Sequence, residues 1–173
     1  MPRWRSQLAE SARGVSSTER TAFSRIALTK PRRSTLRLSH LALVRARDII
    51  NHMMSERADI LNTMIGNGAI VAIMDESEVT TDVPGHADLY ALFPGTDWDR
   101  RARGLGGSTF LPTSSGAEEN ILGYTTDTFF YREDILVHEF SHGVFGLGID
   151  DEFADLESEL DDAYANAQAQ GLW

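Results

Sequence analysis

Cysteine is absent from the 173-residue chain, and so are long apolar runs. Without thiols the protein forms no disulfides, no cysteine-based zinc sites and no cysteine nucleophiles. No apolar run is long enough to cross a bilayer, and the first residues lack the continuous apolar stretch of a secretory signal. Because a domain of this size can fold without disulfides, the cysteine count leaves the cellular compartment open.

Positive charge is scarce outside the N-terminal part of the chain. The formal net charge is −10, yet residues 1–40 hold nine Lys and Arg against two acidic residues, a local charge of +7. Residues 41–173 therefore carry −17, which argues against non-specific nucleic-acid binding. Residues 1–40 are rich in Arg, Ser and Thr without an apolar period, so we expect a disordered N-terminal extension or a misassigned gene start. A transit peptide and a basic nucleic-acid arm are the alternatives.

Organised sequence begins near Leu41. Apolar residues then recur at helical spacing and predict helices up to a glycine-containing stop at residues 66–68. Ala69–Met74 is a short apolar run that predicts a buried strand. From Asp75 to about Leu122 the chain is rich in Pro, Gly, Asp and Thr, which predicts loops and short strands, with an edge strand at Ser108–Leu111.

This loop region contains a glycine cluster, Gly104–Gly107, and three nearby arginines. No predicted strand precedes the cluster and no Lys follows it, so flexible turns explain it better than a phosphate-binding loop does. Arg100, Arg101 and Arg103 could bind a substrate carboxylate, although solvated or salt-bridging roles are more usual for arginine.

An apolar run from about Arg132 to Phe145 predicts the helix on which the interpretation of the whole chain depends. Glu133 and Asp134 are expected in its first turn, where acidic side chains stabilise the positive end of the helix dipole. Gly146 and Gly148 are expected to end it, since glycine is a common terminator.

The predicted helix carries an H-E-x-x-H motif from His138 to His142. At a spacing of four residues both imidazoles project from one helix face and can bind one Zn²⁺, with Glu139 beside them. His138 and His142 would be ligands, and Glu139 would be the general base for metal-activated water in peptide hydrolysis. Tyr124 and Tyr131 are candidate hydrogen-bond donors to the transition state. The alternative is a pair of hydrogen-bonded core histidines with a salt-bridged glutamate.

Catalytic zinc normally has a third protein ligand. No histidine follows His142, and the other histidines are expected at the surface or in hydrogen bonds: His40, His52 and His86. The carboxylates downstream are Asp150, Asp151, Glu152, Asp155, Glu157 and Glu159. Glu157 is the best candidate because it lies beside the apolar face of a last amphipathic helix, formed by Phe153, Leu156, Leu160 and Tyr164. The alternative role for Glu157 is that of a boundary residue reaching solvent.

Six segments spread over residues 43–173 occur together in a known group of proteins. They are ARDIINHM (46–53), TTDVPGH (80–86), WDRRARGLGG (98–107), AEENILGY (117–124), ILVHEFSHG (135–143) and AYANAQAQGLW (163–173). In these segments the chain resembles gluzincin-type zinc metallopeptidases, a group related in fold to the anthrax lethal factor catalytic domain. The combination is far more specific than H-E-x-x-H alone.

The resemblance implies an α+β zincin-like domain over residues 41–173, with the H-E-x-x-H helix packed on a small sheet. It also implies that His138 and His142 are ligands, that Glu139 is the catalyst, and that a third ligand comes from a glutamate on a later helix. In the group that glutamate lies beyond the GLW segment, so the chain is expected to be a truncated or divergent member. Proteins of the group are mostly secreted.

Two functions follow as alternatives. The first is zinc-dependent hydrolysis of a peptide or protein substrate, with Glu157 or another local carboxylate completing the metal site. The second is a zincin-like module that binds metal weakly or not at all and acts as a binding module. Nucleic-acid binding led by the basic N-terminal segment is disfavoured by the acidity of residues 41–173, and no membrane span is expected.

Overall fold

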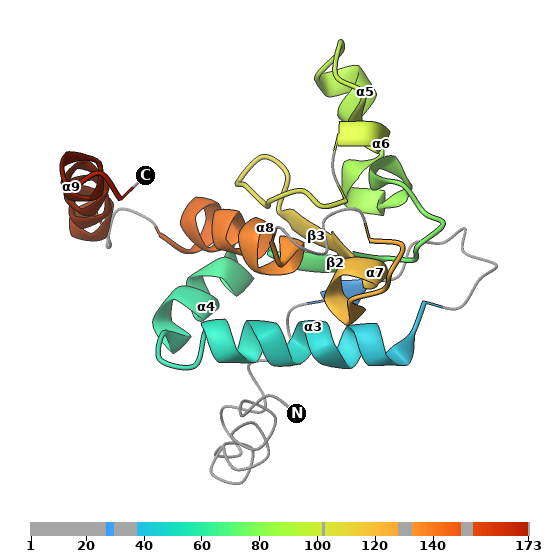
Figure 1. The fold of residues 1–173 in the computed structure, drawn as a ribbon, viewed down its shortest axis with the longest axis horizontal. Helices are drawn as coiled ribbons and strands as arrows, with labels where there is room; N and C mark the ends of the chain where they lie inside the picture. The colour runs from blue at the N-terminus through green and yellow to red at the C-terminus, as the bar shows by residue number, and fades with distance from the viewer. Residues whose placement is uncertain (1–26, 30–37, 102, 128–132, 150–153, 173) are drawn as a thin grey trace, which may run out of the picture.

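The computed structural model describes residues 27–29, 38–101, 103–127, 133–149 and 154–172 (Figure 1). The elements follow in the order β1 Ala27–Thr29, α3 His40–Met53, α4 Ala58–Gly66, β2 Ile70–Met74, η1 Thr80–Asp82, η2 Pro84–His86, α5 Leu89–Leu92, α6 Trp98–Arg101, β3 Thr113–Ala117, α7 Glu118–Leu122, α8 Ile135–Gly143, the π-helical turn η3 Val144–Gly148, and α9 Ala154–Ala169. Helices predominate around a small parallel sheet, which agrees with the α+β class predicted from the sequence.

The sheet has the strand order β1-β2-β3, and both neighbouring pairs are parallel. The strand predicted at Ala69–Met74 is confirmed as β2, whose Ile70 lies between Ala27 and Thr113. β1 lies inside the predicted disordered extension, so that prediction does not hold for residues 27–29. Three residues are too few to show a strand period, and their pairing depends on β2. The rest of the extension up to residue 37 lies outside the described residues.

β3 is not where the sequence predicts a strand. The edge strand expected at Ser108–Leu111 is absent from that stretch, and the strand lies at Thr113–Ala117 instead, with all five residues buried. The sequence TSSGA resembles a loop because it is polar and contains glycine. The hydroxyls of its two serines are satisfied inside the protein, since the Ser114 Oγ accepts from the Gly107 N–H at 3.0 Å and the Ser115 Oγ from the Leu105 N–H at 3.1 Å. Satisfied hydroxyls can be buried at little cost.

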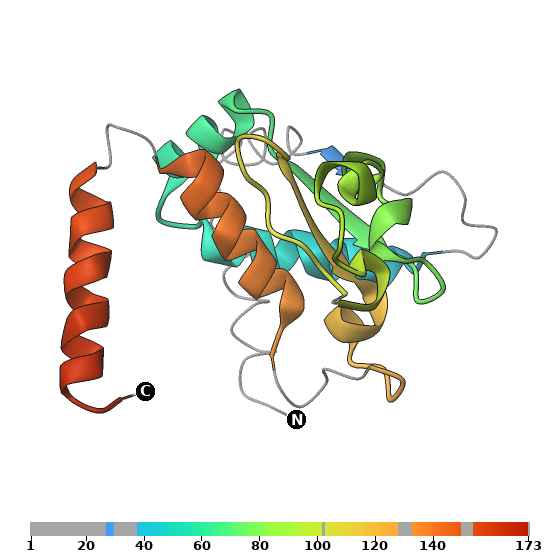
Figure 2. The same cartoon turned by 90° about the horizontal axis from the view of Figure 1, so that it is seen from above.

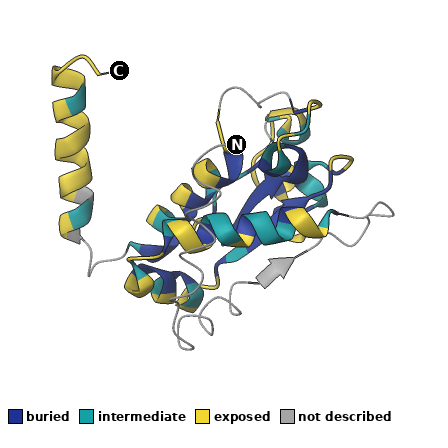
Figure 3. Cartoon of the chain, turned by 60° about the horizontal axis from the view of Figure 1, so that its bottom comes forward, coloured by how far each residue is buried: buried dark blue, intermediate teal, exposed yellow. Residues whose placement is uncertain are grey.

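The two faces of β2 pack against different parts of the chain, because successive side chains in a strand point to opposite faces. Val71 and Ile73 join the main hydrophobic core, which includes buried residues of α3, α4 and α8. Ala72 and Met74 join a smaller cluster with Val83, which follows η1. The helices predicted between Leu41 and the glycine stop are confirmed as α3 and α4. Figure 3 shows many buried residues in the main body of the structure and mostly exposed ones in α9.

α8 packs against β3 and buries one side, formed by Ile135, Leu136, Phe140 and Gly143. Asp134 caps the helix by accepting a hydrogen bond from the Val137 N–H at 3.1 Å, so Glu133 and Asp134 precede the helix rather than form its first turn. Gly146 does not end the helical backbone, which continues through η3 to Gly148. A Cβ at Gly148 would lie 2.5 Å from the Ile60 Cγ2, so this glycine permits close contact with α4.

α9 confirms the predicted last helix, although Phe153 of its expected apolar face lies outside the described residues. Figures 1 and 2 both show α9 standing apart from the body formed by the sheet and the other helices. Leu160 and Tyr164 are each 53% exposed, so its apolar face is not covered by the described part of the body. Within the described ranges, no helix is both long and apolar enough to span a membrane.

Candidate metal centre

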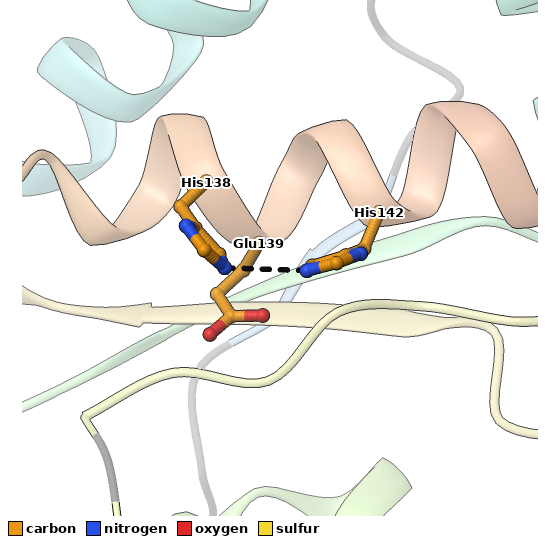
Figure 4. A group of neighbouring side chains, drawn as sticks. All are labelled: His138, Glu139 and His142. Atoms are coloured by element: carbon orange, nitrogen blue, oxygen red, sulfur yellow. Dashed lines mark hydrogen bonds between the residues drawn. The ribbon is translucent and has the colours of Figure 1, made fainter. Parts of the chain in front are cut away.

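His138, Glu139 and His142 come together on α8 as the H-E-x-x-H spacing predicts (Figure 4). The two imidazole Nε2 atoms lie 3.2 Å apart, and the ring centroids lie 5.0 Å apart. One candidate ligand atom from each residue lies within 4.8 Å of those of the other two. No other group of three or more such side chains is found among the residues that the structure describes.

The separation of the two imidazoles suits a shared metal ion. Two nitrogens bound to one Zn²⁺ at ~2.0–2.1 Å in a tetrahedral site are about 3.3 Å apart, close to the observed 3.2 Å. The same distance also suits an N–H···N hydrogen bond between the rings. Both rings are exposed, however, which contradicts the alternative of buried core histidines. An exposed pair can be reached by an ion and by a substrate from solvent.

Glu139 differs from the two histidines in being half-buried. Burial raises the pKa of its carboxyl above the usual value, although the neighbouring His138 and His142 and the Arg101 cation act in the opposite direction. A carboxylate with a raised pKa accepts a proton more readily. Glu139 therefore differs from a fully solvated surface carboxylate.

Glu133 is a member of the site that the sequence analysis missed, because it was assigned only to the helix dipole. Its Oε2 lies 3.0 Å from the Nδ1 of His138, on the side of the ring opposite the Nε2 that approaches His142. The signal in the sequence was an acidic residue five positions before a candidate ligand. That spacing does not place two residues on one helix face, and the contact forms because Glu133 lies before the N-cap.

The glycine cluster was interpreted from the sequence as flexible turns, and the structure corrects this. A Cβ at Gly106 would lie 2.4 Å from the Cβ of His142, and a Cβ at Gly104 would lie 2.9 Å from the Cγ of Glu139. Gly104 and Gly106 therefore lie so close to the motif that side chains are excluded at these two positions. An isolated antiparallel bridge between Leu105 and Ser115 also ties it to β3.

The third ligand predicted from the sequence stays a prediction. Glu157 lies on α9, and its side chain is outside the described part of the structure, as are Asp150, Asp151 and Glu152. In the part of the chain that is described, no carboxylate other than that of Glu139 groups with the two histidines.

Two of the arginines singled out from the sequence have contacts in the structure. Arg103 forms an ion pair with Glu119 at 2.6 Å and donates to the carbonyls of Glu78 and Asp75, so it has the structural role expected of arginine. The guanidinium of Arg101 lies 5.6 Å from the centroid of the Trp98 ring.

His86 is fully buried, and its Nε2 hydrogen-bonds to the carbonyl of Thr113, as the expected hydrogen-bonding role predicts. His40 and His52 are exposed on α3, as expected. Tyr124 is half-buried, and Tyr131 lies outside the described residues.

Comparison with protein-family models, with curated proteins and with solved structures finds no match. The arrangement of side chains on α8 is therefore the main ground on which a function is argued.

Proposed function

We propose that this chain is a zincin-like domain in which His138 and His142 bind Zn²⁺ and Glu139 acts as the general base of peptide-bond hydrolysis. The observation that carries the proposal is the approach of the two Nε2 atoms to 3.2 Å, with the half-buried Glu139 carboxylate beside them. The resemblance of six sequence segments to gluzincin-type metallopeptidases supports the same assignment.

The proposed reaction depends on the bound metal ion and on Glu139. Bound Zn²⁺ supplies Lewis-acid chemistry, because it lowers the pKa of water and polarises a carbonyl group. The Glu139 carboxylate takes a proton from the attacking water and passes it to the leaving amine. Both histidines are exposed, so a substrate can reach them from solvent.

A second function follows from the ligand count. Catalytic zinc normally has three protein ligands, and in the described residues only Glu139 groups with the two histidines. α9, which carries Glu157, stands apart from α8 in Figures 1 and 2. If no downstream carboxylate completes the site, the chain is a zincin-like module that binds metal weakly and acts through binding rather than hydrolysis.

Substitution of Glu139 tests the catalytic assignment. We expect Glu139→Ala to abolish hydrolysis of a mixed peptide library while leaving the zinc content nearly unchanged, because the base is lost and both imidazoles remain. Glu56→Ala is the matched control, since it removes an exposed glutamate in the turn between α3 and α4. Hydrolysis that survives in Glu139→Ala would falsify the mechanism. Zinc bound without hydrolysis in the wild-type chain would favour the binding module.

A further inference from the structure

The ring of His138 makes a polar contact at each of its two nitrogens. Its Nε2 approaches the Nε2 of His142 at 3.2 Å, and its Nδ1 approaches the Oε2 of Glu133 at 3.0 Å. A neutral imidazole carries one proton, on either nitrogen, and only the other nitrogen has a lone pair for a metal ion. The contact at Nδ1 therefore determines whether Nε2 has a lone pair free to bind a metal ion.

The carboxylate of Glu133 fixes the position of that proton. An ionised carboxylate only accepts hydrogen bonds, so the approach of its Oε2 to 3.0 Å favours a proton on the Nδ1 of His138. The proton is then on Nδ1, and Nε2 keeps its lone pair facing His142. A carboxylate behind a metal-binding histidine also makes the imidazole a stronger ligand.

Glu133 is held in place by the amide of Asn120 on α7. The Nδ2 of Asn120 donates to the Glu133 carbonyl at 3.2 Å, and the Ile135 N–H donates to the Asn120 Oδ1 at 2.8 Å. The same Nδ2 also donates to Asp127 at 2.9 Å. One side chain thus fixes the backbone on both sides of the N-cap. The carboxylate of Glu133 is presented to His138 from this fixed backbone.

We propose that Glu133 is a positioning residue that holds His138 in the tautomer whose Nε2 can bind a metal ion. The inference rests on the proposed metal centre and adds a residue to it. A purely stabilising role explains the contact less well, because the His138 and Glu133 side chains are 50% and 45% exposed. Ion pairs at such exposure contribute little to folding stability.

His142 is held differently, and the difference makes the inference specific. Its ring has the contact with His138, and Gly106 packs against its Cβ. No ion pair or hydrogen bond between His142 and a carboxylate is found within the ranges that the structure describes. Loss of the Glu133 carboxylate should therefore change the tautomer of His138 and leave the packing of His142 unchanged.

The decisive measurement is the tautomer of His138 in the metal-free full chain, read from the ¹⁵N chemical shifts of its imidazole. We expect the proton on Nδ1 in the wild type and a mixture of tautomers in Glu133→Ala. Glu133→Gln should recover part of the preference because its amide oxygen still accepts a hydrogen bond. Glu56→Ala should match the wild type. An unchanged tautomer in Glu133→Ala would overturn the proposal.

Zinc affinity, measured by competition with a chromogenic chelator, provides the second readout. We expect about 10–100-fold weaker binding in Glu133→Ala, partial recovery in Glu133→Gln, and thermal stability close to that of the wild type in both. A tautomer change with no loss of affinity would also overturn the proposal. If the wild type binds no zinc, the proposed metal centre fails, and the ¹⁵N measurement still decides whether Glu133 sets the tautomer.

Discussion

Replacement of Gly106 by alanine tests whether the glycine cluster shapes the site. The added Cβ would lie 2.4 Å from the Cβ and 3.1 Å from the Cγ of His142, and 3.2 Å from the carbonyl oxygen of Glu139. Carbon atoms in contact are about 3.5–4.0 Å apart. The loop and the helix must therefore separate by more than ~1 Å at this point.

The separation is costly because both sides are anchored. The Gly107 N–H donates to the Ser114 Oγ at 3.0 Å, and the Ser114 hydroxyl donates to the Glu139 carbonyl at 3.4 Å. Overpacking of a close contact costs about 1–3 kcal/mol. In a chain of this size each kcal/mol lowers the Tm by about 2–4 °C. Since the displaced atoms belong to His142, zinc affinity should fall together with stability.

Gly66→Ala is the matched control, because a Cβ there meets nothing within 4 Å and the residue lies at the end of α4. Alanine in a helix is favoured over glycine by about 0.5–1 kcal/mol, so this variant should be as stable as the wild type or more so. Both variants are compared by thermal unfolding and by chelator competition. If Gly106→Ala has the same Tm as Gly66→Ala and binds zinc equally well, the cluster does not constrain the motif.

Two further predictions concern residues away from the motif. Arg103→Ala should lower the free energy of unfolding by about 3–5 kcal/mol, because it leaves the buried carboxylate of Glu119 without its ion pair. Arg47→Ala, which breaks an exposed ion pair, is the control and should lower it by less than about 1 kcal/mol. Urea unfolding measures both. Burial lowers the pKa of His86 below 6.5, so the unfolded chain binds the proton more readily and stability should fall as the pH drops below 6.5. In His86→Asn, urea unfolding should no longer show this loss of stability below pH 6.5. If the loss persists in the variant, another group causes it.

The apolar runs were the most informative part of the sequence for the fold. β2 and α8 each contain enough apolar residues to indicate both burial and element type. β3 could not be predicted in this way, because its TSSGA sequence is buried through hydrogen bonds of its hydroxyls rather than through apolar side chains. β1 was missed for another reason, since a three-residue strand has no readable period and exists only through its partner.

Some residues of the candidate site could be predicted from the sequence, and others could not. His138, Glu139 and His142 could be grouped from the sequence because helix geometry alone brings residues four apart together. The contact of His138 with Glu133 depends on the path of the chain before the N-cap, which no helical period describes.

The packing of Gly106 on His142 joins segments that are far apart in the sequence. In sequence, Gly104–Gly107 indicates only conformational freedom, and its use for close approach to α8 is a tertiary property.

The zinc stoichiometry of the purified chain tests the central claim most directly. After equilibrium dialysis against buffered Zn²⁺, elemental analysis should find one zinc per wild-type chain and a loss of that zinc in both His138→Ala and His142→Ala. His52→Ala, which removes an exposed histidine of α3, is the matched control and should retain it. A wild-type chain that binds no zinc, or that binds it equally well without His138 and His142, would contradict the assignment of H-E-x-x-H as a metal centre.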